Sequence, residues 1–207
     1  MMENQKNHWE NIYSTKKSNE VSWTQDVPKT SLDFIHSANL SKQSNIIDIG
    51  GGDSKLVDFL IDEGYENVTV LDISEQSLTR AKQRLGDKAK NVNWIVSDIT
   101  EFAPKTIYDF WHDRAAFHFL ITETQIMKYL LTARQAVKQN GFVTIGTFST
   151  DGPKKCSGLE IRQYSEKTLT AELQKGFEKL KCIATVHETP FHTTQNFLFC
   201  SFKRKNN

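Results

Sequence analysis

Three aspartates in the first half of the chain each close an apolar segment, and such positions can bind a ligand. They are Asp48, Asp72 and Asp98, and the segment before each one is a predicted strand. Ligands of open α/β sheets bind at the carboxyl ends of the strands. We therefore expect the three carboxylates to line one site, although a single Asp after a strand is often only a helix cap or turn residue.

Gly50, Gly51 and Gly52 follow the first aspartate, and their spacing argues against two common nucleotide motifs. A P-loop requires Gly-x-x-x-x-Gly-Lys-Ser/Thr, which this stretch lacks. A dinucleotide fingerprint would need a third glycine at Lys55, and the carboxylate of Asp48 would repel a pyrophosphate. The glycines instead allow a tight turn and a close approach of the backbone to a ligand.

A carboxylate beside the glycine turn favours a ligand that is cationic there and carries no phosphate. S-adenosylmethionine meets both conditions, because it has a sulfonium and an ammonium group. Asp72 ends the second strand, from which a carboxylate can accept hydrogen bonds from both ribose hydroxyls. Asp98 can reach the adenine amino group, and Ser74, the predicted N-cap after Asp72, is assigned to the same site. The residues thus predict S-adenosylmethionine as the cofactor.

The elements that would position these residues alternate as in an α/β protein with a mainly parallel sheet. Five apolar runs predict strands, at 44–50, 67–73, 91–99, 107–113 and 141–149. Helical spacing predicts helices at 3–15, 28–39, 53–64, 74–86, 123–139 and 165–176. Two extended runs at the end suggest an antiparallel pair. We expect one domain over residues 1–207, with residues 1–40 as a helical lid and residues 41–207 as the core.

Composition narrows the class of protein further. The 26 Lys and Arg nearly balance the 25 Asp and Glu, which argues against a dedicated nucleic-acid binder. Three cysteines without a Cys-x-x-Cys argue against a disulfide framework and a metal site, and for a reducing compartment. No run approaches the roughly 18 apolar residues of a membrane span, and the start lacks the core of a signal peptide. We expect a soluble cytoplasmic protein without membrane association.

The stretches DIGGGDS, VLDIS, SDIT and YDFWHDRAAFHFL resemble the successive motifs of class I S-adenosylmethionine-dependent methyltransferases, over about residues 8–203. The motif WHDRAAFHFL is most similar to a bacterial subgroup of that family. The resemblance implies a Rossmann-like methyltransferase fold with a seven-stranded, mainly parallel sheet, an antiparallel last strand and helices on both faces. It also implies methyl transfer from the cofactor by in-line displacement.

Carried over by position, the resemblance implies specific contacts with the cofactor. Asp48, Gly50 and Gly52 would surround its methionine part, and Asp72 would bind the ribose. Adenine would lie beside Ile73, with Asp98 at its amino group and Ile99 on its ring face. Ser54 departs from the commoner form of the motif, which has a third glycine there.

The acceptor is expected just beyond the fourth strand, where four ionisable residues gather. By location, Asp113 would line the pocket next to the methyl group, Arg114 could bind a substrate carboxylate, and His118 is the candidate general base. Alternatively, Asp113 and Arg114 pair with each other or with His112 and stiffen the strand end. His112 itself is expected to be buried structure.

Two other segments could border the site. In related methyltransferases a segment before the sheet covers the cofactor, which suggests Tyr13 and Trp23 as lid residues; a plain amphipathic turn is the alternative. Cys156 follows Lys154 and Lys155, which would lower the pKa of its thiol. It is either an incidental surface cysteine or a residue that orders the substrate.

These observations leave three functional hypotheses. The first is methylation of a small molecule with a thiol, amine, carboxylate or metalloid acceptor. The second is protein lysine methylation, because the opening HW…Y resembles that of some protein-lysine methyltransferases. The third is a cofactor-binding regulator without catalysis. The nucleobase signatures Asn/Asp-Pro-Pro-Tyr and Pro-Cys are missing, which argues against a DNA substrate.

Overall fold

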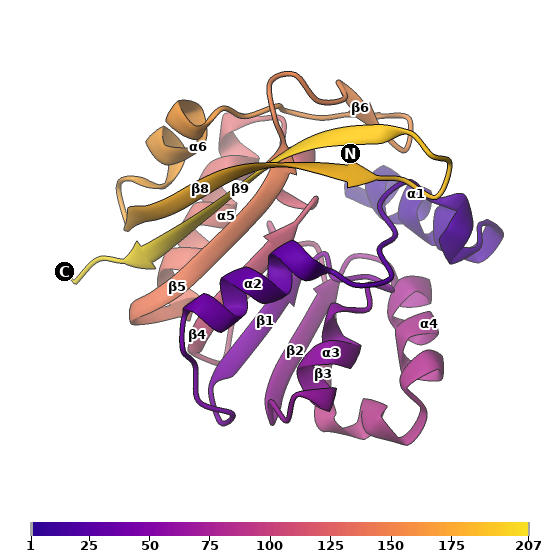
Figure 1. The fold of residues 1–207 in the computed structure, drawn as a ribbon, viewed down its shortest axis with the longest axis horizontal. Helices are drawn as coiled ribbons and strands as arrows, with labels where there is room; N and C mark the ends of the chain where they lie inside the picture. The colour runs from indigo at the N-terminus through magenta and orange to yellow at the C-terminus, as the bar shows by residue number, and fades with distance from the viewer. Residues whose placement is uncertain (1, 207) are drawn as a thin grey trace.

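The computed structural model describes residues 2–206 and is built around a seven-stranded sheet (Figure 1). The strand order is β3-β2-β1-β4-β5-β9-β8, and β9 runs antiparallel to both of its neighbours. The strands are β1 (Asn45–Ile49), β2 (Asn67–Asp72), β3 (Val92–Val96), β4 (Tyr108–Arg114), β5 (Val137–Phe148), β8 (Phe177–Glu188) and β9 (Thr194–Arg204). The predicted mainly parallel sheet with its antiparallel last strand is confirmed.

Six α-helices within residues 2–206 connect or precede these strands. They are α1 (Met2–Thr15), α2 (Lys29–Ser37), α3 (Leu56–Asp62), α4 (Glu75–Leu85), α5 (Glu123–Ala136) and α6 (Glu166–Leu173). The predicted N-cap forms, since Ser74 accepts a hydrogen bond from the Ser77 amide. Thr122 and Gln125 make a capping box at the start of α5. A short hairpin, β6 (Lys155–Cys156) with β7 (Leu159–Glu160), lies in the segment between β5 and α6.

Helices cover both faces of the sheet, as predicted. Side chains along each strand alternate between these faces, so each strand contributes to two cores. In β1, Ile46 packs in the core under α2, α3 and α4, whereas Ile47 packs in the core under α5 and α6. In β4, Phe110 and Trp111 alternate in the same way. Consecutive residues at the ends of these strands therefore face different environments.

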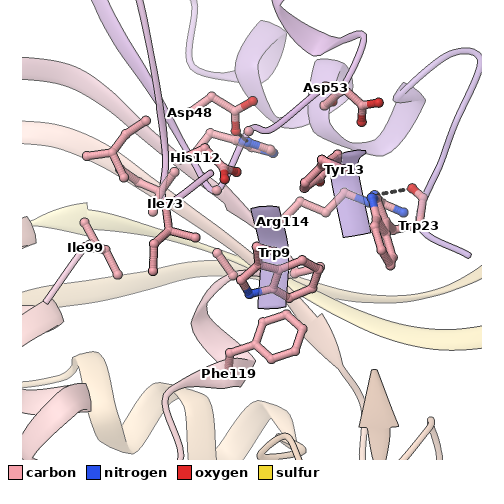
Figure 2. A pocket seen from close by; sticks show the side chains of 18 of the residues that line it. Trp9, Tyr13, Trp23, Asp48, Asp53, Ile73, Ile99, His112, Arg114 and Phe119 are labelled. Atoms are coloured by element: carbon pink, nitrogen blue, oxygen red, sulfur yellow. Dashed lines mark hydrogen bonds and ion pairs between the residues drawn. The ribbon is translucent and has the colours of Figure 1, made fainter. Parts of the chain in front are cut away.

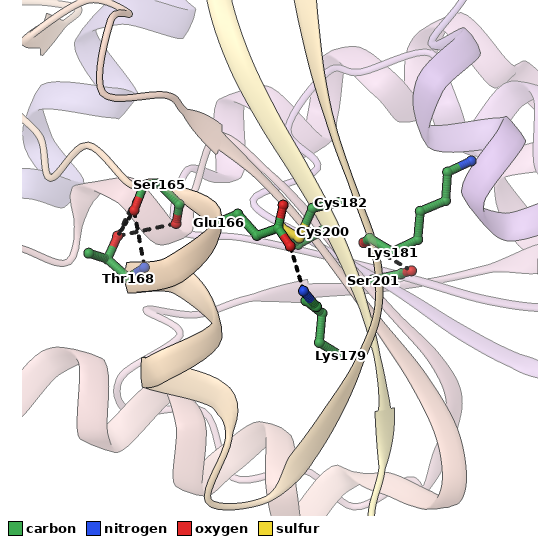
Figure 3. The surroundings of a disulfide bond; sticks show 8 residues. All are labelled: Ser165, Glu166, Thr168, Lys179, Lys181, Cys182, Cys200 and Ser201. Atoms are coloured by element: carbon green, nitrogen blue, oxygen red, sulfur yellow. Dashed lines mark hydrogen bonds and ion pairs between the residues drawn. A yellow bond between two sulfur atoms is a disulfide. The ribbon is translucent and has the colours of Figure 1, made fainter.

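A disulfide bond joins β8 to β9, and the expectation of unpaired cysteines was wrong. Cys182 and Cys200 lie directly opposite each other in the hairpin, with 4.1 Å between their Cα atoms (Figure 3). Their separation of 18 residues concealed the pairing, because only the register of the hairpin brings them together. Cys156 is a free thiol. The cysteine count therefore no longer supports a reducing compartment.

Removing this disulfide should lower the free energy of unfolding by about 2–4 kcal/mol, because the bond restricts the unfolded chain. We expect Cys182→Ala, or the reduced wild-type protein, to unfold at a lower urea concentration than the oxidised protein. Cys156→Ala provides the matched control, since it should keep the full response to reductant. Identical urea midpoints with and without reductant would show that the bond contributes nothing.

None of the helices in residues 2–206 has the length and apolar character needed to cross a membrane. Within the same range, no three His, Cys, Asp or Glu side chains are grouped so that they could hold a metal ion.

Candidate functional site

A pocket opens at the carboxyl ends of β1, β2 and β4, under α1 and the segment that follows it (Figure 2). It brings together most of the predicted site residues. Those on its surface are Tyr13, Trp23, Asp48, Gly50, Gly51, Asp72, Ile73, Asp98, Ile99 and Arg114. Four others do not line it: Gly52, Ser74, Asp113 and His118.

The glycine turn forms one wall of the pocket and has no room for side chains. A Cβ at Gly51 would stand 2.7 Å from Oδ2 of Asp48 and 2.7 Å from Cγ1 of Val70. A Cβ at Gly50 would stand 2.5 Å from the Cβ of Ala116, and the φ angle of Gly50 is +62°. Only glycine tolerates both constraints. The turn therefore presents bare backbone to the pocket, as a closely held ligand requires.

Asp48 is held at the pocket floor by a buried hydrogen-bonded chain. Its Oδ1 lies 2.7 Å from Nδ1 of His112, and Nε2 of His112 lies 2.8 Å from Oγ of Ser31. All three side chains are buried and border the pocket. His112 is buried, as expected, and its hydrogen bond fixes the position of the Asp48 carboxylate. Nothing in the sequence pointed to Ser31, which lies 81 positions before His112 and is placed beside it by α2.

The other two aspartates present carboxylate oxygens along the β2 and β3 side of the pocket. Oδ1 of Asp72 accepts from the Ser74 amide at 2.8 Å, so Ser74 supports Asp72 from outside the pocket surface. Burial raises the pKa of Asp72 to about 7. Oδ1 of Asp98 accepts from the amide and the hydroxyl of Thr100, both at 2.8 Å.

Ile73 and Ile99 line the same pocket and give it apolar walls (Figure 2). The arrangement combines hydrogen-bond acceptors for hydroxyl and amino groups, flat apolar contacts and a carboxylate for a cation. These features fit an adenosyl group attached to a cationic amino-acid chain, as in S-adenosylmethionine. The cations near the glycine turn, Lys55 and Arg84, are already paired with Asp26 and Asp58.

Asp113 does not line the pocket, although the prediction placed it there. Its Oδ1 accepts from the amides of Ala116 and Phe117 at 3.0 Å, and its Oδ2 accepts from the Tyr129 hydroxyl at 2.8 Å. It is fully buried. Strand alternation explains the error, since Asp113 points to the opposite face of β4 from His112 and Arg114. Asp113 and Arg114 form no ion pair among the described residues.

His118 also lies in a position that contradicts its predicted role as general base. Its ring is fully buried and stacks on Phe148 at a centroid distance of 4.7 Å. Its Nδ1 accepts a long hydrogen bond, 3.4 Å, from the Phe148 amide. Burial lowers the pKa of His118 to about 3, so the ring is neutral at physiological pH. The 3-10 turn at 117–119 directs it into the core instead of the pocket.

Arg114 and Cys156 both line the pocket at the β5 and β9 side. Nη1 of Arg114 donates to the Trp23 carbonyl oxygen at 2.9 Å (Figure 2). Cys156 is buried, and burial raises the pKa of its thiol to about 12. The expectations of a surface position and of a lowered thiol pKa were therefore both wrong.

Aromatic side chains from α1 and the following segment form the roof of the pocket. Trp9 contacts Trp23 and Phe119, with ring centroids 5.7 Å and 5.1 Å apart, and Tyr13 is buried beneath them (Figure 2). Tyr13 and Trp23 therefore lie where a lid would place them. Trp9 was not predicted, although its helical spacing with Tyr13 was a usable signal.

Glu10 fastens this roof to the protein core. Its carboxylate accepts hydrogen bonds from the Ser74 hydroxyl and from the amides of Glu75 and Gln76 at the start of α4. The contact satisfies free amides at a helix N-terminus with a negative charge, which is favourable.

Replacing Glu10 by Ala should loosen the roof, because the loss of a helix-capping carboxylate costs about 1 kcal/mol. We expect faster hydrogen exchange at the amides of residues 9–15, with the strand amides unchanged. Glu178→Ala, on the exposed face of β8, is the control and should leave α1 protected. Unchanged exchange in Glu10→Ala would show that other contacts hold the roof.

Comparison with known proteins supports a methyltransferase. The family model described as a methyltransferase domain matches residues 46–141. Malonyl-acyl-carrier-protein O-methyltransferase 1 of Ilyobacter polytropus is 29% identical over 143 residues, covering 68% of this chain and 48% of that protein. N-terminal Xaa-Pro-Lys N-methyltransferase 1-A of Xenopus laevis is 26% identical over 117 residues, covering 54% and 51%. The chain spans about half the length of these curated relatives.

Solved structures share the fold. The N-methyltransferase NodS of Bradyrhizobium japonicum, solved with S-adenosyl-L-homocysteine, superposes with a TM-score of 0.73 at 15% identity. The match covers 97% of this chain and 100% of that one. By the methyltransferase-domain match, the curated relatives and the shared fold, the chain is similar to S-adenosylmethionine-dependent methyltransferases.

Proposed function

We propose that the protein methylates a small-molecule acceptor. The observation that carries this proposal is the aromatic roof over the pocket. Trp9, Trp23 and Phe119 line the pocket together with Arg114, and their packed rings would narrow the space left for an acceptor. A small acceptor fits such a space better than a folded protein does.

Different residues of the chain would bind the cofactor and align it with the acceptor. S-adenosylmethionine supplies an electrophilic methyl group on a sulfonium. Asp48 would face its cationic part, while Asp72 and Asp98 would accept hydrogen bonds from ribose and adenine. The roof would exclude water from the transfer, which proceeds by alignment of the reacting atoms. A base is required only for an acceptor that arrives protonated, and we assign none.

A labelling experiment tests the class of acceptor. The purified protein is incubated with methyl-labelled S-adenosylmethionine and a cell lysate, and the products are separated by size. We expect the label in the small-molecule fraction, absent when the protein is omitted. Label in the protein fraction would instead support a protein acceptor, the activity named for the Xenopus relative. Tight cofactor binding without any transfer would indicate a regulator.

A further inference from the structure

The pocket carries opposite charges at its two ends. Asp48 near the end of β1, Asp72 at the end of β2 and Asp98 after β3 supply the carboxylates of the proposed cofactor side, where Lys55 and Arg84 also line the pocket. Arg114 ends β4 and reaches toward β9, where its guanidinium lies 5.1 Å from the centroid of the Phe197 ring. In the sheet order, this side is the one away from the adenosine residues.

Arg114 makes no direct ion pair within residues 2–206, and the Asp48 carboxylate acts on its charge only from beyond ion-pair distance. Nη1 donates to the Trp23 carbonyl oxygen, but Nη2 is buried without a hydrogen-bond partner among the described residues. No carboxylate within residues 2–206 lies within ion-pair distance of it, and the carboxylate of Asp48 is bound to His112. An unpaired buried cation is unfavourable unless a ligand compensates it.

The neighbouring titratable groups do not provide a negative charge. Burial raises the pKa of the Cys156 thiol to about 12, so the thiol is neutral at pH 7. His187, whose Nε2 lies 2.7 Å from the Ser22 carbonyl oxygen, has its pKa lowered by burial and by Arg114. Burial lowers the pKa of Arg114 only to about 10, so it remains a cation.

We propose that Arg114 binds a carboxylate of the methyl acceptor, which makes the acceptor a small organic anion. This inference rests on the proposed function. The guanidinium matches a carboxylate in shape and charge, and the Phe197 ring beside it shields the pair on one side. Trp9 and Trp23 line the same pocket, so tryptophan fluorescence can report binding of the anion.

The test uses malonate as the probe and malonamide as its uncharged counterpart, added to protein saturated with S-adenosylhomocysteine. We expect saturable binding of malonate, followed by tryptophan fluorescence and calorimetry, and none of malonamide. Arg114→Gln should weaken malonate binding at least tenfold. Arg162→Gln, an arginine already paired with Glu123 and Glu172 on the surface, should not change it. Equal malonate binding by wild type and Arg114→Gln, or no binding by wild type, would overturn the proposal.

The cofactor also has a carboxylate, so a second arm separates the two sources. Binding of S-adenosylhomocysteine is compared with that of 5′-methylthioadenosine, which lacks the amino-acid part. We expect Arg114→Gln to bind both as the wild type does. A selective loss of S-adenosylhomocysteine would assign Arg114 to the cofactor and overturn the acceptor role.

Two further controls keep the outcome clear. Circular dichroism verifies that Arg114→Gln is folded, and Arg114→Lys, which retains the charge, should still prefer malonate to malonamide. A wild-type protein that binds neither adenosyl compound would instead refute the proposed function. Failure of the proposed function and failure of this inference thus give different results.

Discussion

Replacing Asp72 by Asn is expected to weaken binding of S-adenosylhomocysteine by about 1–3 kcal/mol, roughly five- to 150-fold. Asp72 is buried at the end of β2, and one of its oxygens is already engaged with the Ser74 amide. The other oxygen faces the glycine turn, 3.3 Å from where a Cβ at Gly52 would stand. An amide could not accept hydrogen bonds from two hydroxyls as a carboxylate does.

The same carboxylate should make cofactor binding depend on pH. Burial raises the pKa of Asp72 to about 7, so the protonated form dominates below that value in the free protein. Since the ionised form is the better acceptor, affinity should rise with pH, by about tenfold between pH 6 and pH 8. Calorimetric titrations across this range measure the effect.

Two variants serve as controls for the predicted effect of Asp72 on cofactor affinity. Asp72→Asn should bind with the same reduced affinity at every pH, because the titrating group is gone. Asp87→Asn, an exposed carboxylate paired with Lys90, should behave as wild type. If Asp72→Asn bound S-adenosylhomocysteine as tightly as wild type, the assignment of Asp72 to the ribose would be wrong.

The sequence predicted the features that depend on local pattern. Alternating apolar segments predicted the mainly parallel sheet of an α/β protein, and three aspartates after strands predicted a ligand site at one edge of that sheet. The structure gathers Asp48, Asp72 and Asp98 at a single pocket. Such features are readable because parallel strands must end at the same edge, whatever the rest of the chain does.

Contacts between distant segments could not be predicted in this way. The hydrogen bond of Ser31 to His112 and the disulfide of Cys182 with Cys200 depend on where α2 docks and how the last hairpin is aligned. The error at Asp113 was different, because the two-residue period of a strand already separated it from Arg114. Proximity in sequence was taken for proximity in space.

The fold also explains why one strand end supplies both pocket-lining residues and a structural anchor. At the end of β4, His112 and Arg114 face the pocket, while Asp113 faces the core under α5. The Asp113 carboxylate fixes the turn that carries Ala116. Ala116 in turn packs against Gly50 of the glycine turn. Structural and ligand-binding residues are thus adjacent in sequence and separate in function, which mutations can reveal.

Replacing Asp113 by Ala is expected to lower the free energy of unfolding by on the order of 3–5 kcal/mol. The change leaves the amides of Ala116 and Phe117 and the Tyr129 hydroxyl without their acceptor, and each buried unpaired group costs about 1–3 kcal/mol. Urea unfolding measures the loss. Asp87→Ala, at an exposed carboxylate, is the matched control and should change stability little.

Asp113→Asn separates the charge of this residue from its hydrogen bonds. Burial raises the pKa of Asp113 to about 6 in the folded protein, above its usual value of 3.8, so the folded state binds this proton more tightly than the unfolded state. The wild type should therefore lose stability relative to Asp113→Asn as pH rises from about 4 to about 6. Asp113→Asn should still bind S-adenosylhomocysteine, because Asp113 does not line the pocket. If Asp113→Ala were stable but no longer bound S-adenosylhomocysteine, Asp113 would contribute to the cofactor site after all.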